Sequence, residues 1–275
     1  MTVAGKTALI TGSTDGVGRL VAVRLAAAGA AVLVLGRDRP RAEQVLREIR
    51  EAGGSAHFYP ADLSSLAEVR ALAEAVERDH PRLDILVSNA GIGTAGQSSK
   101  RQTSQDGHEL RFAVNYLAGF LLTRLLLPLL TASSPARIVM VASAGQQEID
   151  FADVMLTRGY GGVRAYCQSK LAQIMFAADL AQELAGTGVT ATSLHPASYM
   201  DTTMVRAAGV APMSTVAQGA DAILNLAASP EMAGRTGIYF DGLRPARPHA
   251  QAADVAARAR LRALSLDLVG LPADA

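Results

Sequence analysis

The sequence of 275 residues has little of several things: a single cysteine (Cys167), no tryptophan, and only 4% aromatic residues. One cysteine cannot form a disulfide within the chain and excludes a structural zinc site built from cysteines. The five histidines are scattered and form no H-x3-H pair, so we expect no bound metal. With 26 basic and 25 acidic residues the formal net charge is +1. No overall field would therefore draw the chain to nucleic acid or to an anionic membrane.

Long apolar runs are also missing. The segment before Gly12 has no apolar core of the kind found in secretory signals. The run over 25–36 is shorter than the roughly 20 residues that span a bilayer, and the run over 120–130 is interrupted by Arg124 and Pro128. We therefore expect a cytoplasmic protein that is not anchored in a membrane.

What the chain does have is a regular alternation of short aliphatic runs and helix-length segments. Apolar residues make up 49% of the sequence and charged residues 19%, which is typical of a globular protein. Strands are predicted at 7–11, 31–35, 57–59, 84–88, 137–143, 189–194 and 237–240, and helices at 18–28, 41–52, 65–79, 105–131, 165–185 and 216–228. Strands without polar alternation, separated by helices, predict a doubly wound parallel sheet. The fold class is therefore α/β, with about seven Rossmann-like strands and helices on both faces. No repeat or linker divides the chain, so residues 1–275 are predicted to form one domain.

A glycine-rich turn follows the first strand and opens the first helix. Glycine permits a tight turn and a close approach of the backbone to a pyrophosphate, which the helix N-terminus then stabilises. Three glycines alone are weak evidence, and a structural turn that binds nothing is the alternative. The strand before and the helix after favour a dinucleotide site. The predicted cofactor-binding residues here are Gly12, Ser13, Thr14, Asp15, Gly16, Val17 and Gly18.

The next strand ends just before Arg37 and Asp38. An acidic residue about 20 positions after the glycine turn grips the ribose 2′-hydroxyl of NAD, whereas an arginine there suits the 2′-phosphate of NADP. Arg37 occupies that place, so we expect NADP(H), and Asp38 keeps NAD(H) as the less favoured alternative.

Two further groups follow strands three and four, at the sheet edge where open α/β sheets bind ligands. Asp62 either contacts adenine or caps the next helix, and Asn89 either contacts the cofactor or serves as a turn residue. The cofactor-binding prediction includes Asp62, Leu63, Asn89, Ala90 and Gly91.

The pair Tyr166-x3-Lys170 carries the chemistry. On a helix, positions i and i+4 share a face, and a nearby cation lowers the pKa of a tyrosine from its ordinary value of about 10. A tyrosine of this kind serves as a general acid/base near neutral pH. Ser143, at the end of the fifth strand, would face the same cleft. A surface pair without a role is the alternative.

In this order, the motifs resemble those of the short-chain dehydrogenase/reductase family, along nearly the whole chain. TGSTDGVG is similar to the TGxxxGxG motif of the family, SNAG to its NNAG motif, and Tyr166-x3-Lys170 to its active-site pair. The stretches over 106–130 and 165–184 and the tail after Gly237 resemble the retinol-dehydrogenase-like branch.

The resemblance implies specific roles. Tyr166 would donate the proton, Lys170 would lower the pKa of Tyr166 and bind the nicotinamide ribose, and Ser143 would polarise the carbonyl. Asn115 would hold a water that links Lys170 to solvent. Gly12, Gly16 and Gly18 would line the pyrophosphate, Asp62 the adenine and Asn89 the adenosine ribose, and the cofactor set would include Tyr166, Lys170, Pro196 and Thr202.

Two departures from the family pattern concern the loop after the sixth strand. The usual Pro-Gly is Pro196-Ala197 here, and because alanine resists positive φ we expect a different loop path. The following segment is about one residue longer than the common pattern, which leaves Thr202 and Thr203 as alternatives for the nicotinamide contact.

The sequence thus predicts an NADP(H)-dependent carbonyl reductase, or the reverse alcohol dehydrogenase. Its substrate would be a moderately apolar small molecule contacted by 144–164 and 198–213. The resemblance also implies a homodimer or homotetramer paired through 105–131 and 165–185. Two alternatives stay open: a sensor that binds NADP(H) without turnover, and a redox-neutral enzyme, such as an epimerase, that retains its cofactor.

Overall fold

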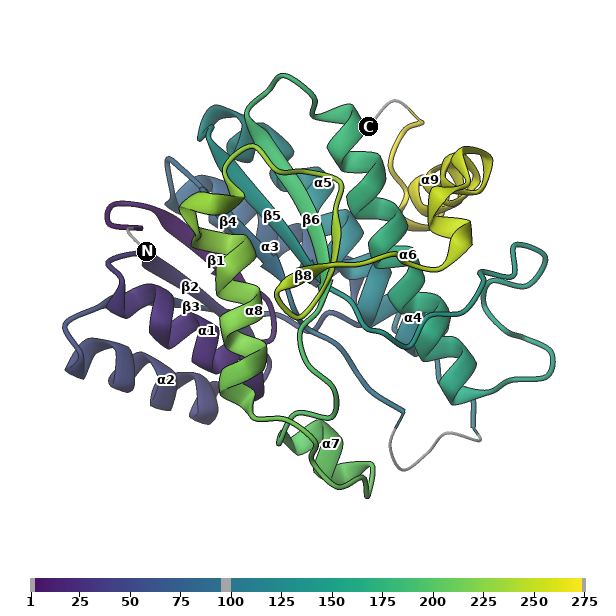
Figure 1. The fold of residues 1–275 in the computed structure, drawn as a ribbon, viewed down its shortest axis with the longest axis horizontal. Coiled ribbons are helices and arrows are strands. Elements are labelled where there is room, and N and C mark those ends of the chain that lie inside the picture. Colours follow the sequence, from purple (N-terminus) through teal and green to yellow (C-terminus); the bar gives the residue numbers. More distant parts are fainter. Residues whose placement is uncertain (1–2, 95–99, 274–275) are drawn as a thin grey trace.

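In the computed structural model, which describes residues 3–94 and 100–273, eight strands form one sheet in the order β3-β2-β1-β4-β5-β6-β7-β8 (Figure 1). All neighbours pair in parallel except the last two, which are antiparallel. The strands are β1 (Thr7–Ile10), β2 (Ala31–Gly36), β3 (Ser55–Pro60), β4 (Ile85–Ser88), β5 (Ala136–Val141), β6 (Val189–His195), β7 (Tyr239–Asp241) and β8 (Arg244–Pro245). The predicted doubly wound α/β fold is confirmed. The strand β8 was not predicted, because two residues produce no periodic pattern.

The helices lie in two layers, one on each face of the sheet. One face carries α1 (Gly16–Ala27), α2 (Arg39–Glu51) and α8 (Val216–Ala228), whose apolar residues form one buried cluster with β1 and β2. The other carries α3 (Leu66–Asp79), α5 (Ala118–Ala132) and α6 (Gly162–Glu183). Side chains of Asp38, Ser65 and Thr215 cap α2, α3 and α8 and satisfy first-turn amides that have no helical partner. The buried strands therefore have apolar cover on both faces.

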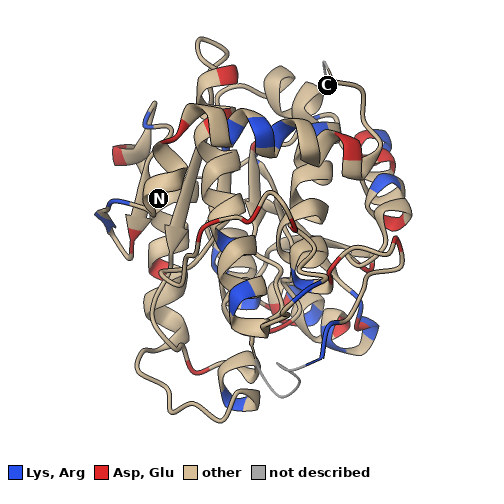
Figure 2. Cartoon of the chain, turned by 90° about the vertical axis from the view of Figure 1, so that its right-hand side faces the viewer, with Lys and Arg blue, Asp and Glu red and all other residues tan. Residues whose placement is uncertain are grey.

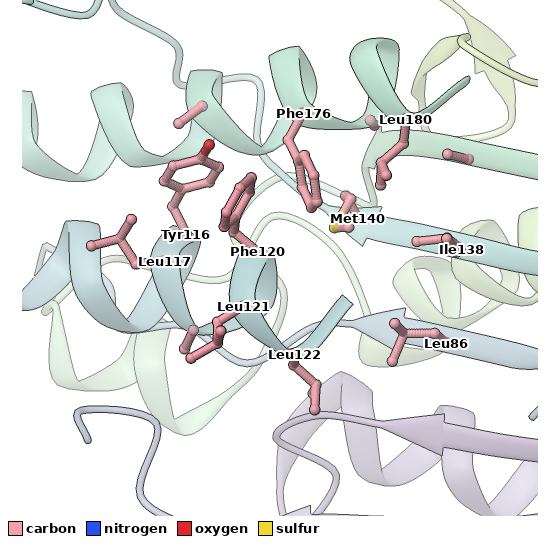
Figure 3. Packing of buried hydrophobic residues seen from close by; sticks show 14 of the residues in the cluster. Leu86, Tyr116, Leu117, Phe120, Leu121, Leu122, Ile138, Met140, Phe176 and Leu180 are labelled. Atoms are coloured by element: carbon pink, nitrogen blue, oxygen red, sulfur yellow. The ribbon is translucent and has the colours of Figure 1, made fainter. Parts of the chain in front are cut away.

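The core under α5 and α6 is aromatic. Tyr116, Phe120 and Phe176 stack with ring centroids 4.7–6.3 Å apart and pack toward Ile138 and Met140 of β5 (Figure 3). Before α5, the helical segment starts with α4 (Leu110–Phe112) and passes through a π-helical turn, η1 (Ala113–Leu117). π-Turns inside helices are frequent at functional sites. Here the turn contains Asn115.

Elements not predicted from the sequence lie mainly in the last quarter of the chain. They are a short α7 (Thr203–Ala207), the 3₁₀ turns η2 (Pro230–Met232) and η3 (Ala250–Ala253), and α9 (Val255–Val269). Helix α9 packs against α6 and η1, where Ser265 bonds the Tyr116 hydroxyl at 2.7 Å and Arg262 pairs with Glu183 at 3.3 Å. It therefore covers part of the surface of the two helices that were predicted to pair subunits.

Figure 2 shows basic and acidic residues interspersed over the helices and loops on the side of the molecule that it presents. This distribution matches the near-zero net charge.

Candidate active site

The glycine turn after β1 adopts a conformation that side chains would prevent. Gly12 has φ +66°, and a Cβ there would lie 2.9 Å from the Cα of Ala90. A Cβ on Gly18 would clash with the Gly12 carbonyl oxygen and lie 2.5 Å from Asn89 Nδ2. The backbone of the turn therefore packs directly against the end of β4, and no side chain projects from Gly12 or Gly18.

Thr11 and Asn89 lock the ends of β1 and β4 together. The Thr11 hydroxyl accepts hydrogen bonds from the amides of Asn89 and Ala90, each at 2.9 Å. Asn89 Nδ2 donates in return to the carbonyl oxygens of Thr11 at 2.9 Å and Gly12 at 3.3 Å. The Nδ2 group of Asn89 thus shapes the turn, and a contact of Asn89 with the cofactor stays a prediction.

Ser13 lies away from the other predicted cofactor residues. Its side chain is fully buried, donates to the Ile10 carbonyl at 2.7 Å and accepts from the Leu35 amide at 3.0 Å. This hydroxyl joins β1 to β2. Leu63 is likewise buried in the core under α3. Neither side chain reaches the rim of the cleft.

A charged rim surrounds the entrance to the glycine turn. Arg41 Nη1 lies 3.1 Å from the carboxylate of Asp15, the residue that caps α1, and Arg37 Nη1 lies 3.4 Å from Asp62. Asp38 accepts from the Arg41 amide at 3.0 Å as the cap of α2. An open hollow of about 670 Å³ lies between them, lined by Thr14, Arg37, Asp38, Arg39, Pro40 and Arg41.

Asp62 is held as a carboxylate. Burial would raise its pKa, but the Ser64 amide at 2.9 Å and the Arg37 guanidinium stabilise the charged form, so the pKa lies below its ordinary value. Its carboxylate therefore belongs to the rim and does not cap α3, which Ser65 caps.

At the carboxyl end of β5 and the start of α6, Ser143 and Tyr166 converge on Gly145. A Cβ at Gly145 would lie 3.5 Å from Ser143 Oγ and 3.8 Å from the Tyr166 ring. Ser143 follows β5 and Tyr166 lies in the first turns of α6. The structure thus brings these two predicted residues together, although they are far apart in the sequence.

The pKa of Tyr166 is shifted mainly by burial. Burial raises it above its ordinary value, and a hydrogen bond with Ser143 partly opposes this. Lys170 Nζ lies 5.7 Å from the Tyr166 ring centre and bonds the Val141 carbonyl and Gln173, and its predicted lowering of the Tyr166 pKa stays a prediction. Burial also lowers the pKa of Lys170 to about 7, so its ammonium is only partly charged near neutral pH.

Asn115 acts as a clamp. Its Oδ1 accepts from the Ile92 amide at 2.8 Å, while Nδ2 donates to the Ile92 carbonyl at 3.2 Å and to Ser169 Oγ at 3.0 Å. It therefore ties the loop after β4 to α6. Gly91 lies between, since a Cβ there would be 3.3 Å from Asn115 Oδ1 and 3.5 Å from Lys170 Nζ.

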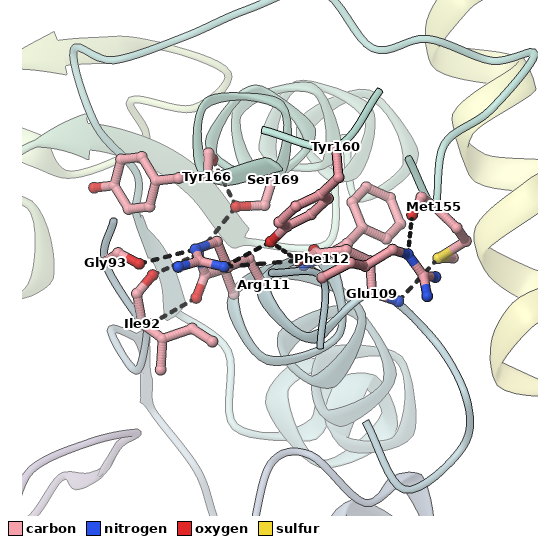
Figure 4. A network of polar contacts seen from close by, with 11 residues as sticks. Ile92, Gly93, Glu109, Arg111, Phe112, Met155, Tyr160, Tyr166 and Ser169 are labelled. Carbon is pink, nitrogen blue, oxygen red and sulfur yellow. Dashed lines mark hydrogen bonds and ion pairs between the residues drawn. The ribbon is translucent and has the colours of Figure 1, made fainter. Parts of the chain in front are cut away.

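A buried polar network beside this clamp was not found by sequence reasoning (Figure 4). Arg111 donates to the Gly93 carbonyl at 2.9 Å and to the Tyr160 hydroxyl at 2.7 Å. Tyr160 in turn donates to Glu109 at 2.9 Å. The network joins the loop after β4, the start of α4 and the 144–164 segment. No local pattern could reveal it, because its members meet only in the folded chain.

The segment after β6 lies over the glycine turn. Thr203 Oγ1 donates to Asp15 at 2.8 Å, while Thr202 caps α7 and its methyl group would lie 3.4 Å from a Cβ at Gly16. Thr203 is thus the threonine that hydrogen-bonds to the turn. Ala197 keeps an ordinary φ, and the positive φ of 43° falls at Tyr199.

Tyr199 is a second residue that the sequence did not identify. A positive φ is unusual for a bulky residue and occurs most often at functional sites. After burial, its phenol is among the groups that raise the pKa of Tyr166. Exposed apolar side chains gather in this segment: Tyr199, Met204, Val210 and Met213.

These residues fit a dinucleotide. The glycine turn packs its backbone closely against the end of β4, α1 begins directly after it, and arginines line the hollow beyond it. Within the part of the chain that the structure describes, no cluster of side chains could hold a metal ion.

Comparisons with known proteins agree with this geometry. The family model "short chain dehydrogenase" matches residues 6–211. Human retinol dehydrogenase 13 is 36% identical, covering 99% of this chain and 87% of its own length. Mouse polyprenol dehydrogenase is 37% identical, covering 97% and 84%.

Among solved structures, a Mycobacterium paratuberculosis protein superposes with a TM-score of 0.80 at 28% identity, covering 98% of this chain and 95% of that one. The NADP complex of Pseudomonas aeruginosa RhlG has a TM-score of 0.72 at 29% identity, covering 87% and 95%. Structures of this kind, with NAD(P) bound, support a nicotinamide cofactor.

The expected cytoplasmic location is contradicted by these relatives. The retinol and polyprenol dehydrogenases among them are membrane-associated, which does not fit that expectation. In addition, Leu110–Ala132 is long and apolar enough to cross a membrane, although 72% of its most apolar window is buried inside the protein. In the sequence, Arg124 and Pro128 interrupt this run. Arg124 is itself buried, against Glu183, and so does not mark a polar surface.

Proposed function

The chain belongs to the short-chain dehydrogenase family of oxidoreductases, and from this premise we propose that it transfers a hydride between NADP(H) and the carbonyl or alcohol carbon of an apolar small molecule. Tyr166 acts as the general acid/base. The convergence of the Ser143 and Tyr166 side chains beside the buried Lys170 is the observation that carries this proposal.

The nicotinamide, when bound, supplies or accepts the hydride. During reduction the Tyr166 hydroxyl donates its proton to the substrate oxygen, and Ser143 Oγ donates a hydrogen bond to the same atom and polarises the carbonyl. Lys170 stabilises the phenolate that Tyr166 becomes, and Asn115 holds the loop after β4 against α6. In alcohol oxidation the same phenolate accepts the proton.

The charged rim supports NADP(H) over NAD(H). Arg37 and Arg41 are half or more exposed on the hollow beyond the glycine turn, where guanidinium groups would bind a 2′-phosphate. Asp38, which alone favoured NAD, is used as the cap of α2 and pairs with Arg41. The residues proposed to hold the cofactor are Gly12, Thr14, Gly16, Gly18, Arg37, Asp62, Asn89, Lys170, Pro196 and Thr202.

The substrate is proposed to be an apolar alcohol or aldehyde of the isoprenoid kind named in the relatives. The exposed apolar side chains over 199–213 support this, because they would cover a long hydrocarbon chain. Pairing of subunits through α5 and α6 stays a prediction. Light scattering tests it by giving the molar mass in solution, which is that of one chain if the cover by α9 prevents pairing.

The test is nicotinamide absorbance with NADPH and NADH in parallel, against retinal, a polyprenal, short ketones and quinones. We expect turnover with NADPH and an apolar aldehyde. NADPH consumption with only short polar carbonyls would contradict the substrate class. Tight NADPH binding without turnover on any of these would favour the sensor, and product formation without net NADPH consumption would favour the redox-neutral enzyme.

A further inference from the structure

The side chain of Gln173 bonds Lys170 and has no role in the proposed mechanism. Gln173 lies on α6 with Tyr166 and Lys170, at the spacing i, i+4, i+7 that places all three on one helix face. It is 1% exposed. Its Oε1 accepts a hydrogen bond from Lys170 Nζ at 2.9 Å.

The two amide atoms of Gln173 are used very differently. Oε1 bonds Lys170, whereas Nε2 is buried and has no hydrogen-bond partner among the described residues. A buried N–H without a partner destabilises a fold, and an apolar side chain of the same shape would avoid that loss. The neighbours Leu171, Ala172 and Ile174 are buried apolar residues. Stability alone therefore does not explain an amide at this position.

Lys170 explains it. Its ammonium has three N–H groups, of which one bonds the Val141 carbonyl at the end of β5 and one bonds Gln173, both at 2.9 Å. Two fixed acceptors on one tetrahedral nitrogen leave a single N–H and set its direction. The absence of a side chain at Gly91, whose Cβ would lie 3.5 Å from Nζ, leaves room on the cleft side.

We propose that Gln173 is a positioning residue that holds the Lys170 ammonium through Oε1 and directs its remaining N–H into the reaction site. The inference rests on the proposed function, in which Lys170 serves Tyr166. Gln173 acts only through Lys170, because its own amide is enclosed by α6 and the core.

The contact between Gln173 and Lys170 can be tested through the pKa of Lys170. On its own helix Lys170 faces Tyr166, whose ring centre lies 5.7 Å from Nζ, and β5, the loop after β4 and η1 present the Val141 carbonyl, Gly91 and Asn115, all uncharged. Burial lowers the pKa of Lys170 to about 7. Since no described residue places a carboxylate within ion-pair distance of Nζ, the Gln173 oxygen is a main support of the charged form, and changing it should change the pKa.

The experiment uses the full chain with lysine labelled with ¹³C at Cε, titrated by NMR. The sequence has only three lysines, Lys6, Lys100 and Lys170, so each gives one resolvable signal, and Lys170→Met identifies the signal of Lys170. Gln173→Glu should raise the Lys170 midpoint by at least about one pH unit, a tenfold change, because it places a carboxylate at hydrogen-bond distance. Gln173→Met should lower the midpoint.

Gln168→Met is the matched control. Gln168 is an equally buried glutamine on α6 that bonds the Asp150 amide and the Val154 carbonyl and not Lys170, so this variant should leave the Lys170 midpoint unchanged. Gln173→Asn keeps the amide on a shorter stem and should behave like Gln173→Met. It also provides a second readout if the methionine variant fails to fold.

An unchanged Lys170 midpoint in both Gln173→Glu and Gln173→Asn overturns the proposal, as does an equal shift in Gln168→Met. Failure of the proposed function is separate: the midpoint would move as expected, yet the wild-type protein would reduce no carbonyl. If both hold, Gln173→Met should lower kcat about tenfold at neutral pH and leave the KM of the carbonyl substrate unchanged.

Discussion

The two parts of the candidate site, the charged rim beside the glycine turn and the group around Lys170, use charge in opposite ways. At the nucleotide end, Asp15, Arg37, Arg41 and Asp62 form ion pairs whose arginine side chains are 51–69% exposed. At the reaction end, one ammonium, Lys170, is buried with no carboxylate in contact, and burial lowers its pKa to about 7. Exposed pairs are screened by water and salt and are individually weak, whereas desolvation shifts a pKa by several units. Exposed arginines at the rim can thus adjust the affinity for an anion, whereas a strongly shifted pKa for proton transfer requires a buried group.

The largest effect is expected from Tyr166→Phe. Removing the hydroxyl should lower kcat by about 10²–10⁴-fold, because general acid/base catalysis contributes that much. NADPH binding, followed by the fluorescence of the nicotinamide, should stay within about twofold of the wild type, because the rim is untouched. Near-normal turnover in this variant would falsify the assignment of Tyr166.

Lys170→Met tests the buried end through stability. Unfolded lysine keeps its proton up to about pH 10.4, whereas folded Lys170 releases it near pH 7. Between these values the unfolded state binds more protons, so the free energy of unfolding rises with pH. From pH 7 to 9 the wild type should gain about 1.4 kcal/mol per pH unit more than the variant, measured by urea unfolding. Equal slopes would show that Lys170 keeps its proton in the fold.

Arg37→Ala tests the exposed end. The KM of NADPH should rise about tenfold at low salt, less at high salt, while that of NADH should hardly change. Arg19→Ala is the control, since Arg19 is a similarly exposed arginine that pairs with Glu48 on the outer side of α1 and α2. An equal rise in the KM of both cofactors would mean that Arg37 does not bind a 2′-phosphate.

The smallest effect concerns Tyr199, at the boundary between the two ends. Tyr199→Gly relieves a φ of 43° and should raise the free energy of unfolding by about 0.5–1 kcal/mol, whereas Tyr199→Ala keeps the strain and should give no gain. Chemical unfolding of both variants checks this. The KM of an apolar aldehyde should rise in both, because the aromatic ring is lost. A KM unchanged in both variants would place Tyr199 outside the substrate site.

The sequence predicted the parallel strands and their helices because buried strands and amphipathic helices leave local periodic patterns. Local motifs also singled out the glycine turn and the Tyr166–Lys170 pair, and the family resemblance added the roles of Ser143 and Asn115; the roles of these residues stay predictions. Helix α9 was missed, since its apolar and charged residues are nearly evenly spread around it. Ser13 was assigned to the cofactor because a motif does not show which of its side chains turn inward.

Composition and local motifs by themselves determined the fold class, the dinucleotide turn and the tyrosine–lysine pair. Only the tertiary structure decided the electrostatics: that burial raises the pKa of Tyr166, that Asp38 is used as a helix cap, and that Gln173 contacts Lys170. The physical reason is that pKa values and hydrogen-bond partners depend on what surrounds a group in space, and residues distant in sequence supply most of those surroundings.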